Sequence, residues 1–255
     1  MASNLNFRLV GRRSKGNIEF MKTTTEFAPW LGVFETVRVI DGVPLFVAEH
    51  AAELKRASSM LGLNANFDLR KAQADLPRRS GRWRWIVTTE GTTTLFSEEP
   101  EASAEPLALS VSLVRVGSHN WDARFKTVSY LNHVQALKMA STPEVILLNE
   151  RGEVASAARA NLFWRRGDRL FTPAHETGCR QGVVRGFVLQ RREVEVGDFS
   201  LDDLLAADEI FLTNSMKGIV SVDAVEEDTR HEFSCANALR IEYANAIVEQ
   251  LNKAT

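Results

Sequence analysis

The stretch EVILLNERGEVASAARANLFWRRGDRLFTPAHETGCRQGVVRG, residues 144–186, decides the fold class of this chain. Its apolar runs at 144–149, 161–166 and 169–173 are short and are bounded by charged or turn residues, which is typical of strands. A helical pattern follows over 183–191. Strands that lead into a helix in this way predict a mixed architecture of sheet and helix.

The residues before this stretch predict two hairpins and two helices. Residues 32–47 alternate apolar and polar side chains, with Phe34, Val37 and Val39 among the apolar ones, and they turn at IDG. Helices are expected at 48–62 and 67–76, a second hairpin at 82–97 and a further strand at 107–116.

A break in the pattern at GSHNWD, residues 117–122, predicts a linker between two domains. Residues 1–116 then form a small N-terminal α/β domain, and residues 123–255 form a larger C-terminal domain with a long helix over 235–252. Strands come first and are then mixed with helices, so the sequence predicts a two-domain α/β (α+β) protein. Residues 1–30 carry little pattern and are expected to be partly disordered or to form an edge strand.

Composition and charge exclude several classes of function. The formal net charge of −2 gives no basic excess for nucleic acid, and no apolar run approaches the roughly 20 residues that span a bilayer. The start of the chain lacks the apolar core of a secretory signal, so we expect a cytoplasmic protein. Cys179 and Cys235 are far apart and the five histidines show no paired spacing, so no metal site is predicted.

Local pattern alone assigns no chemistry to Lys126. In RFKTVSYLNHVQALKMA, residues 124–140, this lysine precedes an amphipathic helix, and most lysines are solvated surface residues. Gly182 precedes a helix whose first free N–H groups can bind a phosphate, although a plain turn into a helix is the commoner explanation. The hydroxyls of TNS, residues 213–215, indicate either a binding edge or an ordinary polar strand end.

Five blocks of the sequence, taken together and in order, carry a resemblance to a known family. They are GVFETVRVIDG, EHAAELKRASSMLGL, FKTVSYLNHVQALKMA, the stretch over 144–186 and DEIFLTNSMKGI, and they cover roughly residues 32–222. In this order they resemble the class IV aminotransferases, which are the fold-type IV pyridoxal phosphate (PLP) enzymes. NLFWRRG and FETVRVIDG are most similar to the 4-amino-4-deoxychorismate lyase branch, beside the branched-chain and D-amino-acid aminotransferases. The GDG motif that usually precedes the first block is replaced by PWLG.

The resemblance implies the architecture, the cofactor and the catalytic lysine. The family has a small and a larger domain with PLP in the interdomain cleft, and its members are usually homodimers. Lys126 occupies the position of the Schiff-base lysine, which carries PLP and moves protons at the substrate. The backbone N–H groups of Val183 and Val184 and the hydroxyl of Ser215 are expected at the cofactor phosphate. A transaminase or an aminodeoxychorismate-type lyase acting on a small amino acid or amine is therefore implied.

Three cofactor anchors differ from the usual pattern of the family. Glu53 stands where an arginine usually grips the phosphate, Val184 where a threonine usually meets it, and Ser156 where a glutamate usually pairs with the pyridine nitrogen. Arg56, one helical turn after Glu53, is a candidate replacement for the missing cation. Two hypotheses stay open. One is a PLP enzyme with a rearranged site, and the other is a family member that has lost PLP and uses its cleft for another ligand, for cofactor-independent chemistry or for a non-catalytic binding role.

Overall fold

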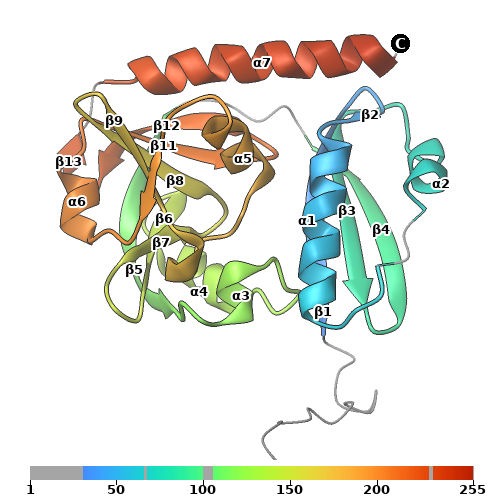
Figure 1. Ribbon diagram of the computed structural model, residues 1–255, viewed down its shortest axis with the longest axis horizontal. Coiled ribbons are helices and arrows are strands. Elements are labelled where there is room, and N and C mark those ends of the chain that lie inside the picture. Colours follow the sequence, from blue (N-terminus) through green and yellow to red (C-terminus); the bar gives the residue numbers. More distant parts are fainter. Residues whose placement is uncertain (1–30, 66–67, 100–105, 230–231, 255) are drawn as a thin grey trace, which may run out of the picture.

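The strands in the part of the chain that the structure describes form two sheets, one of four strands and one of nine. Figure 1 shows the sheets side by side, with helix α7 (Ser234–Ala254) running along the top of both. This mixed architecture confirms the predicted α/β (α+β) fold class. None of the described helices is long and apolar enough to cross a membrane. The computed structural model describes residues 31–65, 68–99, 106–229 and 232–254.

The four-stranded sheet is antiparallel and has the order β2-β1-β3-β4. Side chains alternate along β1 and β3, and the buried face, which includes Trp83 and Trp85, packs against helix α1. Both predicted hairpins are confirmed, although β2 is shorter than predicted because α1 already begins at Val47. The edge strand expected within residues 1–30 lies outside the described residues. The elements of this part are β1 (Gly32–Ile40), β2 (Val43–Pro44), α1 (Val47–Met60), α2 (Leu69–Ala74), β3 (Gly81–Thr88) and β4 (Gly91–Glu98).

The larger sheet has the order β10-β9-β8-β11-β12-β5-β6-β7, with β13 beside β12. Its strands β6 and β11 are buried along almost their whole length, which explains their continuous apolar sequences. The strands are β5 (Leu107–Val116), β6 (Glu144–Asn149), β7 (Val154–Ala157), β8 (Asn161–Arg166), β9 (Arg169–Pro173), β10 (Glu195–Gly197), β11 (Glu209–Asn214), β12 (Gly218–Val225) and β13 (Asp228–Thr229). The helices beside α7 are α3 (Trp121–Arg124), α4 (Leu131–Met139), η2 (His175–Thr177), α5 (Val183–Leu189) and α6 (Leu201–Leu205).

One strand of the predicted N-terminal domain belongs to the larger sheet. The pattern assigns residues 107–116 to the N-terminal domain, whereas this strand, β5, pairs in parallel with β12 and β6 of the larger sheet. Parallel partners are distant in the sequence, so the alternation within the strand could not identify them. The chain therefore changes sheets between Glu98 and Leu107. The predicted linker at 117–122 lies within the large-sheet part, where helix α3 begins.

Helix α7 contacts both parts of the molecule and is held near each end. Gln250 accepts a hydrogen bond from the backbone N–H of Phe46, just before α1, at 2.8 Å. At the other end, the buried carboxylate of Glu209 on β11 accepts hydrogen bonds from Cys235 N and Ala236 N at 3.1 and 2.7 Å. A carboxylate at the start of a helix satisfies its free N–H groups and complements its positive dipole end.

We expect Glu209→Ala to lower the free energy of unfolding by about 3–5 kcal/mol, because it leaves the start of α7 and the side chain of Arg165 without a buried anion. Urea unfolding followed by circular dichroism measures this change. Glu232→Ala is the matched control, since its carboxylate pairs with the same arginine but is 64% exposed. The control should cost less than about 1 kcal/mol, and equal effects of the two substitutions would contradict the anchoring role.

Candidate active site

Lys126 is held at the seam between the two sheets by a short β-bridge. Its backbone oxygen accepts a hydrogen bond from Phe34 N of β1 at 2.8 Å, and Val128 N donates to Gly32 O at 2.9 Å. Gly32 permits this close approach, because a Cβ there would lie only 3.1 Å from the Val128 side chain. The lysine therefore enters the site from an extended segment just before α4 and not from the helix itself.

A buried carboxylate on β1 faces the Lys126 amine. Glu35 Oε2 lies 3.3 Å from Lys126 Nζ and 2.7 Å from His50 Nδ1 on α1. Burial alone would raise the pKa of Glu35, but the charge of Lys126 and the hydrogen bond with His50 outweigh burial and lower the pKa to about 2. The sequence prediction missed Glu35 and His50. The sequence does carry a signal for Glu35, because the alternation of β1 places this residue on the buried face with Val33 and Val37.

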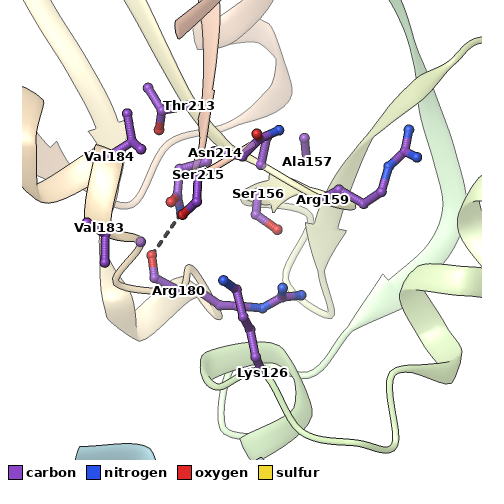
Figure 2. Close-up of a pocket in the computed structure, with 13 residues that line it drawn as sticks. Lys126, Ser156, Ala157, Arg159, Arg180, Val183, Val184, Thr213, Asn214 and Ser215 are labelled. Atoms are coloured by element: carbon purple, nitrogen blue, oxygen red, sulfur yellow. Dashed lines mark hydrogen bonds between the residues drawn. The ribbon is translucent and has the colours of Figure 1, made fainter. Parts of the chain in front are cut away.

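One pocket contains the lysine and most of the residues that the sequence places at the cofactor. Its lining comes from the bridge segment, from β7 and the residues that follow it, from the start of α5 and from the end of β11. The pocket has a volume of about 40 Å³, which is room for roughly three water molecules. In Figure 2, the side chains of Ser156 and Lys126 extend toward the same space. The predicted site residues that line it are Lys126, Ser156, Val183, Val184 and Ser215.

The lining of this pocket is cationic and polar. It contains Lys126, Arg159 and Arg180 with several hydroxyl and amide side chains, and none of the described residues that line it is an aspartate or a glutamate. The Arg159 side chain points away from the pocket and pairs with Glu144 at 3.1 Å (Figure 2). Thr213 has a buried Oγ1 without a hydrogen-bond partner among the described residues. This composition suits an anionic ligand with several acceptor oxygens.

The start of α5 presents free backbone donors. No side chain caps the helix at Gly182, so the N–H groups of Val183 and Val184 have no acceptor within the helix. The amide of Asn161 stabilises the turn by donating to Arg180 O at 2.8 Å. Gly182 is required at this point, because a Cβ there would collide with Asn161 Oδ1. The turn into α5 is therefore built for close approach of backbone to the pocket.

Glu53 lies outside the lining of the Lys126 pocket. Its carboxylate accepts two hydrogen bonds from Arg56, at 2.6 and 2.8 Å. Burial raises the pKa of Glu53, and the hydrogen bond from Arg56 opposes that shift. Both side chains line a second cavity of about 740 Å³ between α1, α5 and α7. Arg56, the candidate replacement for the phosphate-binding cation, is therefore paired with Glu53 and is not among the residues that line the Lys126 pocket.

The residues of the pocket fit most of the requirements of PLP, the cofactor that the resemblance implies. The Lys126 amine can react with the aldehyde group that PLP carries. The free N–H groups of Val183 and Val184 match a phosphate, as does the unpartnered hydroxyl of Thr213. Ser156 supplies a neutral hydroxyl where the family usually has a carboxylate, so a bound ring nitrogen would have no anionic partner among the described residues of the lining.

Two solved structures share the fold of this chain. A branched-chain aminotransferase from Thermoproteus uzoniensis superimposes with a TM-score of 0.77 over 88% of each chain, at 19% sequence identity. An aminotransferase from Brucella abortus, bound to PLP, superimposes with a TM-score of 0.71 over 90% of this chain and 95% of its own, at 20% identity. At these identities the likeness shows the fold, which is that of the fold-type IV enzymes.

The sequence then identifies the family. The family model of amino-transferase class IV matches residues 32–225, so this chain belongs to the class IV aminotransferases. The aminodeoxychorismate lyase of Bacillus subtilis (strain 168) is 28% identical over 231 residues, which cover 77% of this chain and 78% of that relative. The resemblance carried by the five sequence blocks is confirmed.

We expect Glu35→Gln to change the dependence of stability on pH. Because the pKa of Glu35 is lowered from 4.5 to about 2, its carboxylate contributes fully to stability above about pH 4.5 and loses that contribution as the pH falls to about 2. The free energy of unfolding of the wild type should exceed that of Glu35→Gln by roughly 3 kcal/mol at neutral pH. The difference should shrink on acidification.

Urea unfolding at a series of pH values measures this difference. Glu98→Gln is the control, because the Glu98 carboxylate lies on β4 and is 59% exposed. The control should match the wild type at every pH. A difference between wild type and Glu35→Gln that stays constant from neutral to acidic pH would show that the carboxylate is not held ionised by Lys126 and His50.

Proposed function

We propose that this protein is a PLP-dependent enzyme, either a transaminase or an aminodeoxychorismate-type lyase, with Lys126 as its catalytic lysine. The observation that carries the proposal is that Lys126 shares one pocket with Ser156, Val183, Val184 and Ser215, and that the described lining of this pocket has no carboxylate. The Bacillus subtilis relative is named for the lyase reaction, and the Brucella abortus structure contains PLP. Both support this function for a chain of the same family.

In this proposal Lys126 binds the cofactor through its amine, and the same Nζ later moves the proton at the substrate Cα. Glu35 keeps the amine oriented, and the N–H groups of Val183 and Val184 bind the phosphate. When bound, the cofactor supplies an electron sink for the charge that develops at that carbon. Ser156 stabilises a protonated ring less than a carboxylate does, so we expect a weaker sink and slower proton abstraction than in relatives with a glutamate.

We also propose that the two sheets correspond to two domains, a small N-terminal one and a larger C-terminal one. The change of sheet between Glu98 and Leu107 supports a boundary there. The site then lies between the domains, because the lysine-bearing bridge joins β1 to the large-sheet part. A small amino acid or amine is the substrate expected for such a site.

A homodimer in the reducing cytoplasm is the assembly and location that we propose. Both cysteines, Cys179 and Cys235, are free thiols, which fits a compartment that keeps thiols reduced. Large apolar side chains are exposed next to the site, on α3, on α4 and just before α4. A second copy of the chain that covers them would remove this apolar surface from water. The residues of this face are Trp121, Val128, Leu131 and Val134.

We expect Leu131→Asp to weaken dimerisation at least about tenfold, because it places a charge in the apolar face. Leu131 is 74% exposed in the single chain, so the substitution should not disturb the fold. Sedimentation velocity over a range of protein concentrations measures the effect. Ile241→Asp on α7, where the side chain is 64% exposed, is the matched control and should leave the dimer intact. A monomeric wild type would overturn the dimer, and equal weakening by both variants would overturn the assigned face.

Cofactor loading tests the proposed function. Purified protein mixed with excess PLP should gain the visible absorption of lysine-bound aldehyde, and borohydride should fix the cofactor on Lys126. Lys126→Ala should abolish the absorption. Lys138→Ala is the matched control, because Lys138 is exposed on α4 and lies outside the pocket lining. Mass spectrometry of the peptides identifies the modified residue.

Two results would contradict this function. A wild type that gains no absorption with excess PLP would favour a family member that has lost the cofactor. Absorption that persists in Lys126→Ala would show that another amine carries the aldehyde.

A further inference from the structure

A second cavity, beside the Lys126 pocket, lies between helices α1, α5 and α7. In Figure 1, α7 runs above the other two helices, of which α1 belongs to the small-sheet part and α5 to the large-sheet part. The cavity has a volume of about 740 Å³, which is within the range of sites that bind small molecules. Two of its lining residues, Gly182 and Val183, also line the Lys126 pocket, and its other described lining residues do not. The cavity is therefore large enough for a ligand of its own.

A buried arginine without an anionic partner lines this cavity. Arg185 on α5 is 7% exposed, and its Nη2 donates to Pro173 O at 3.0 Å. Its Nε is buried without a hydrogen-bond partner, and no carboxylate among the described residues forms an ion pair with this side chain. Burying a guanidinium costs free energy that one neutral hydrogen bond only partly offsets. An anion bound in the cavity would balance this charge.

The other charged residues of the lining do not compensate the charge of Arg185. Glu53 and Arg56 pair with each other. Four further charged residues, two acidic and two basic, are exposed, so water screens them and their charges cancel. They are Glu49, Glu249, Arg191 and Lys253. The buried part of the cavity therefore carries the positive charge of Arg185.

A glycine in the middle of α5 leaves room for a ligand. Gly186 lines the cavity, and a Cβ there would lie in open space. Its backbone is helical and does not have a positive φ. Glycine is the least favourable residue in a helix after proline. Neither packing within the chain nor backbone conformation requires a glycine at this position, whereas close approach of a ligand to α5 explains it.

The remaining walls of the cavity suit the body of a small organic molecule. The rings of Phe46 and Phe187 pack edge to face with their centres 6.3 Å apart. The guanidinium carbon of Arg191 lies 3.5 Å from the centre of the Phe187 ring. Side-chain amides add polar groups to these aromatic walls, as is usual in small-molecule sites. These amides belong to Gln181, Gln190 and Gln250.

We propose that this cavity is a second ligand site, which binds a small organic anion with its carboxylate at Arg185 and its apolar or aromatic body along α5 at Gly186. A planar guanidinium matches the two oxygens of a carboxylate. A ligand in this site adjoins the turn at Gly182 without entering the Lys126 pocket. The inference goes beyond the proposed function, because it uses neither PLP nor Lys126.

Benzoate and its neutral analogue benzamide test the anion site. Both are titrated into the protein, and binding is followed by ligand-observed nuclear magnetic resonance. The wild type should bind benzoate at least about tenfold more tightly than benzamide. Arg185→Met should remove this preference, and Arg185→Lys should keep part of it. Arg192→Met is the matched control, because Arg192 pairs with Glu242 outside the lining, and it should bind benzoate like the wild type.

Gly186→Leu tests the position of the ligand body. A leucine side chain would project into the open space at Gly186, so the affinity for both probes should fall at least about tenfold. The melting temperature should stay the same or rise, because leucine favours a helix. This variant therefore decides the case if Arg185→Met does not fold. Ala244→Leu is the control, because Ala244 is exposed on α7 outside the lining, and it should bind benzoate like the wild type.

Two results of these titrations would overturn the inference. One is a wild type that binds benzoate no more tightly than benzamide. The other is a folded Gly186→Leu that binds benzoate like the wild type.

Cofactor loading of the same proteins distinguishes this inference from the proposed function. Gly186→Leu mixed with excess PLP should gain the same visible absorption as the wild type, since it leaves Lys126 and its pocket unchanged. Loss of both the absorption and benzoate binding in this variant would assign the cavity to the cofactor site and overturn the inference. If the wild type gains no absorption with PLP but its preference for benzoate is lost in Arg185→Met, the proposed function fails and the second site stands.

Discussion

Two backbone hydrogen bonds between β1 and residues 126–128 determine where Lys126, the proposed catalytic lysine, lies. They join a strand of the small sheet to the segment before α4, so the amine of Lys126 lies at the seam of the two sheets. Glu35, next to Phe34 on the bridged strand, reaches that amine from the small sheet. The other described residues that line the pocket belong to the large-sheet part. A ligand in this pocket would therefore contact the large-sheet part, while Glu35 of the small sheet orients the amine of Lys126.

Two cations of the pocket, Lys126 and Arg180, have partners of different charge. Lys126 has the buried carboxylate of Glu35, which holds the amine in one direction and keeps its charge balanced before a ligand arrives. Arg180, which also lines the pocket, donates a hydrogen bond to the uncharged imidazole of His133. The carboxylate of Glu53 lies outside the pocket lining, where it pairs with its own arginine.

Local sequence pattern predicts those elements whose partners are near in the chain. The hairpins of the small sheet and the C-terminal helix follow from alternation and helical spacing, and all are present. The sheet of strand β5 could not be predicted in this way, because its parallel partners begin at Glu144 and Gly218, far along the chain. The alternation of β1 was recognised from Phe34, Val37 and Val39, but it did not identify Glu35, which lies on the buried face with Val37 and Val39.

The prediction of the candidate site needed more than local sequence pattern. Nothing local to Val184 or Ser215 indicates that they meet Lys126, since three separate segments bring them together. The order of the five family blocks predicted this juxtaposition. The position of Arg180 in the pocket was not predicted, because a sequence does not show which charged side chains lie together or which of them are paired.

A crystal structure of the protein grown with PLP tests the central claim most directly. We predict density that is continuous from Lys126 Nζ to the cofactor, with the phosphate on the N–H groups of Val183 and Val184. A structure in which the Lys126 amine still contacts Glu35 alone, with PLP absent or bound in the cavity beside Glu53, would contradict it.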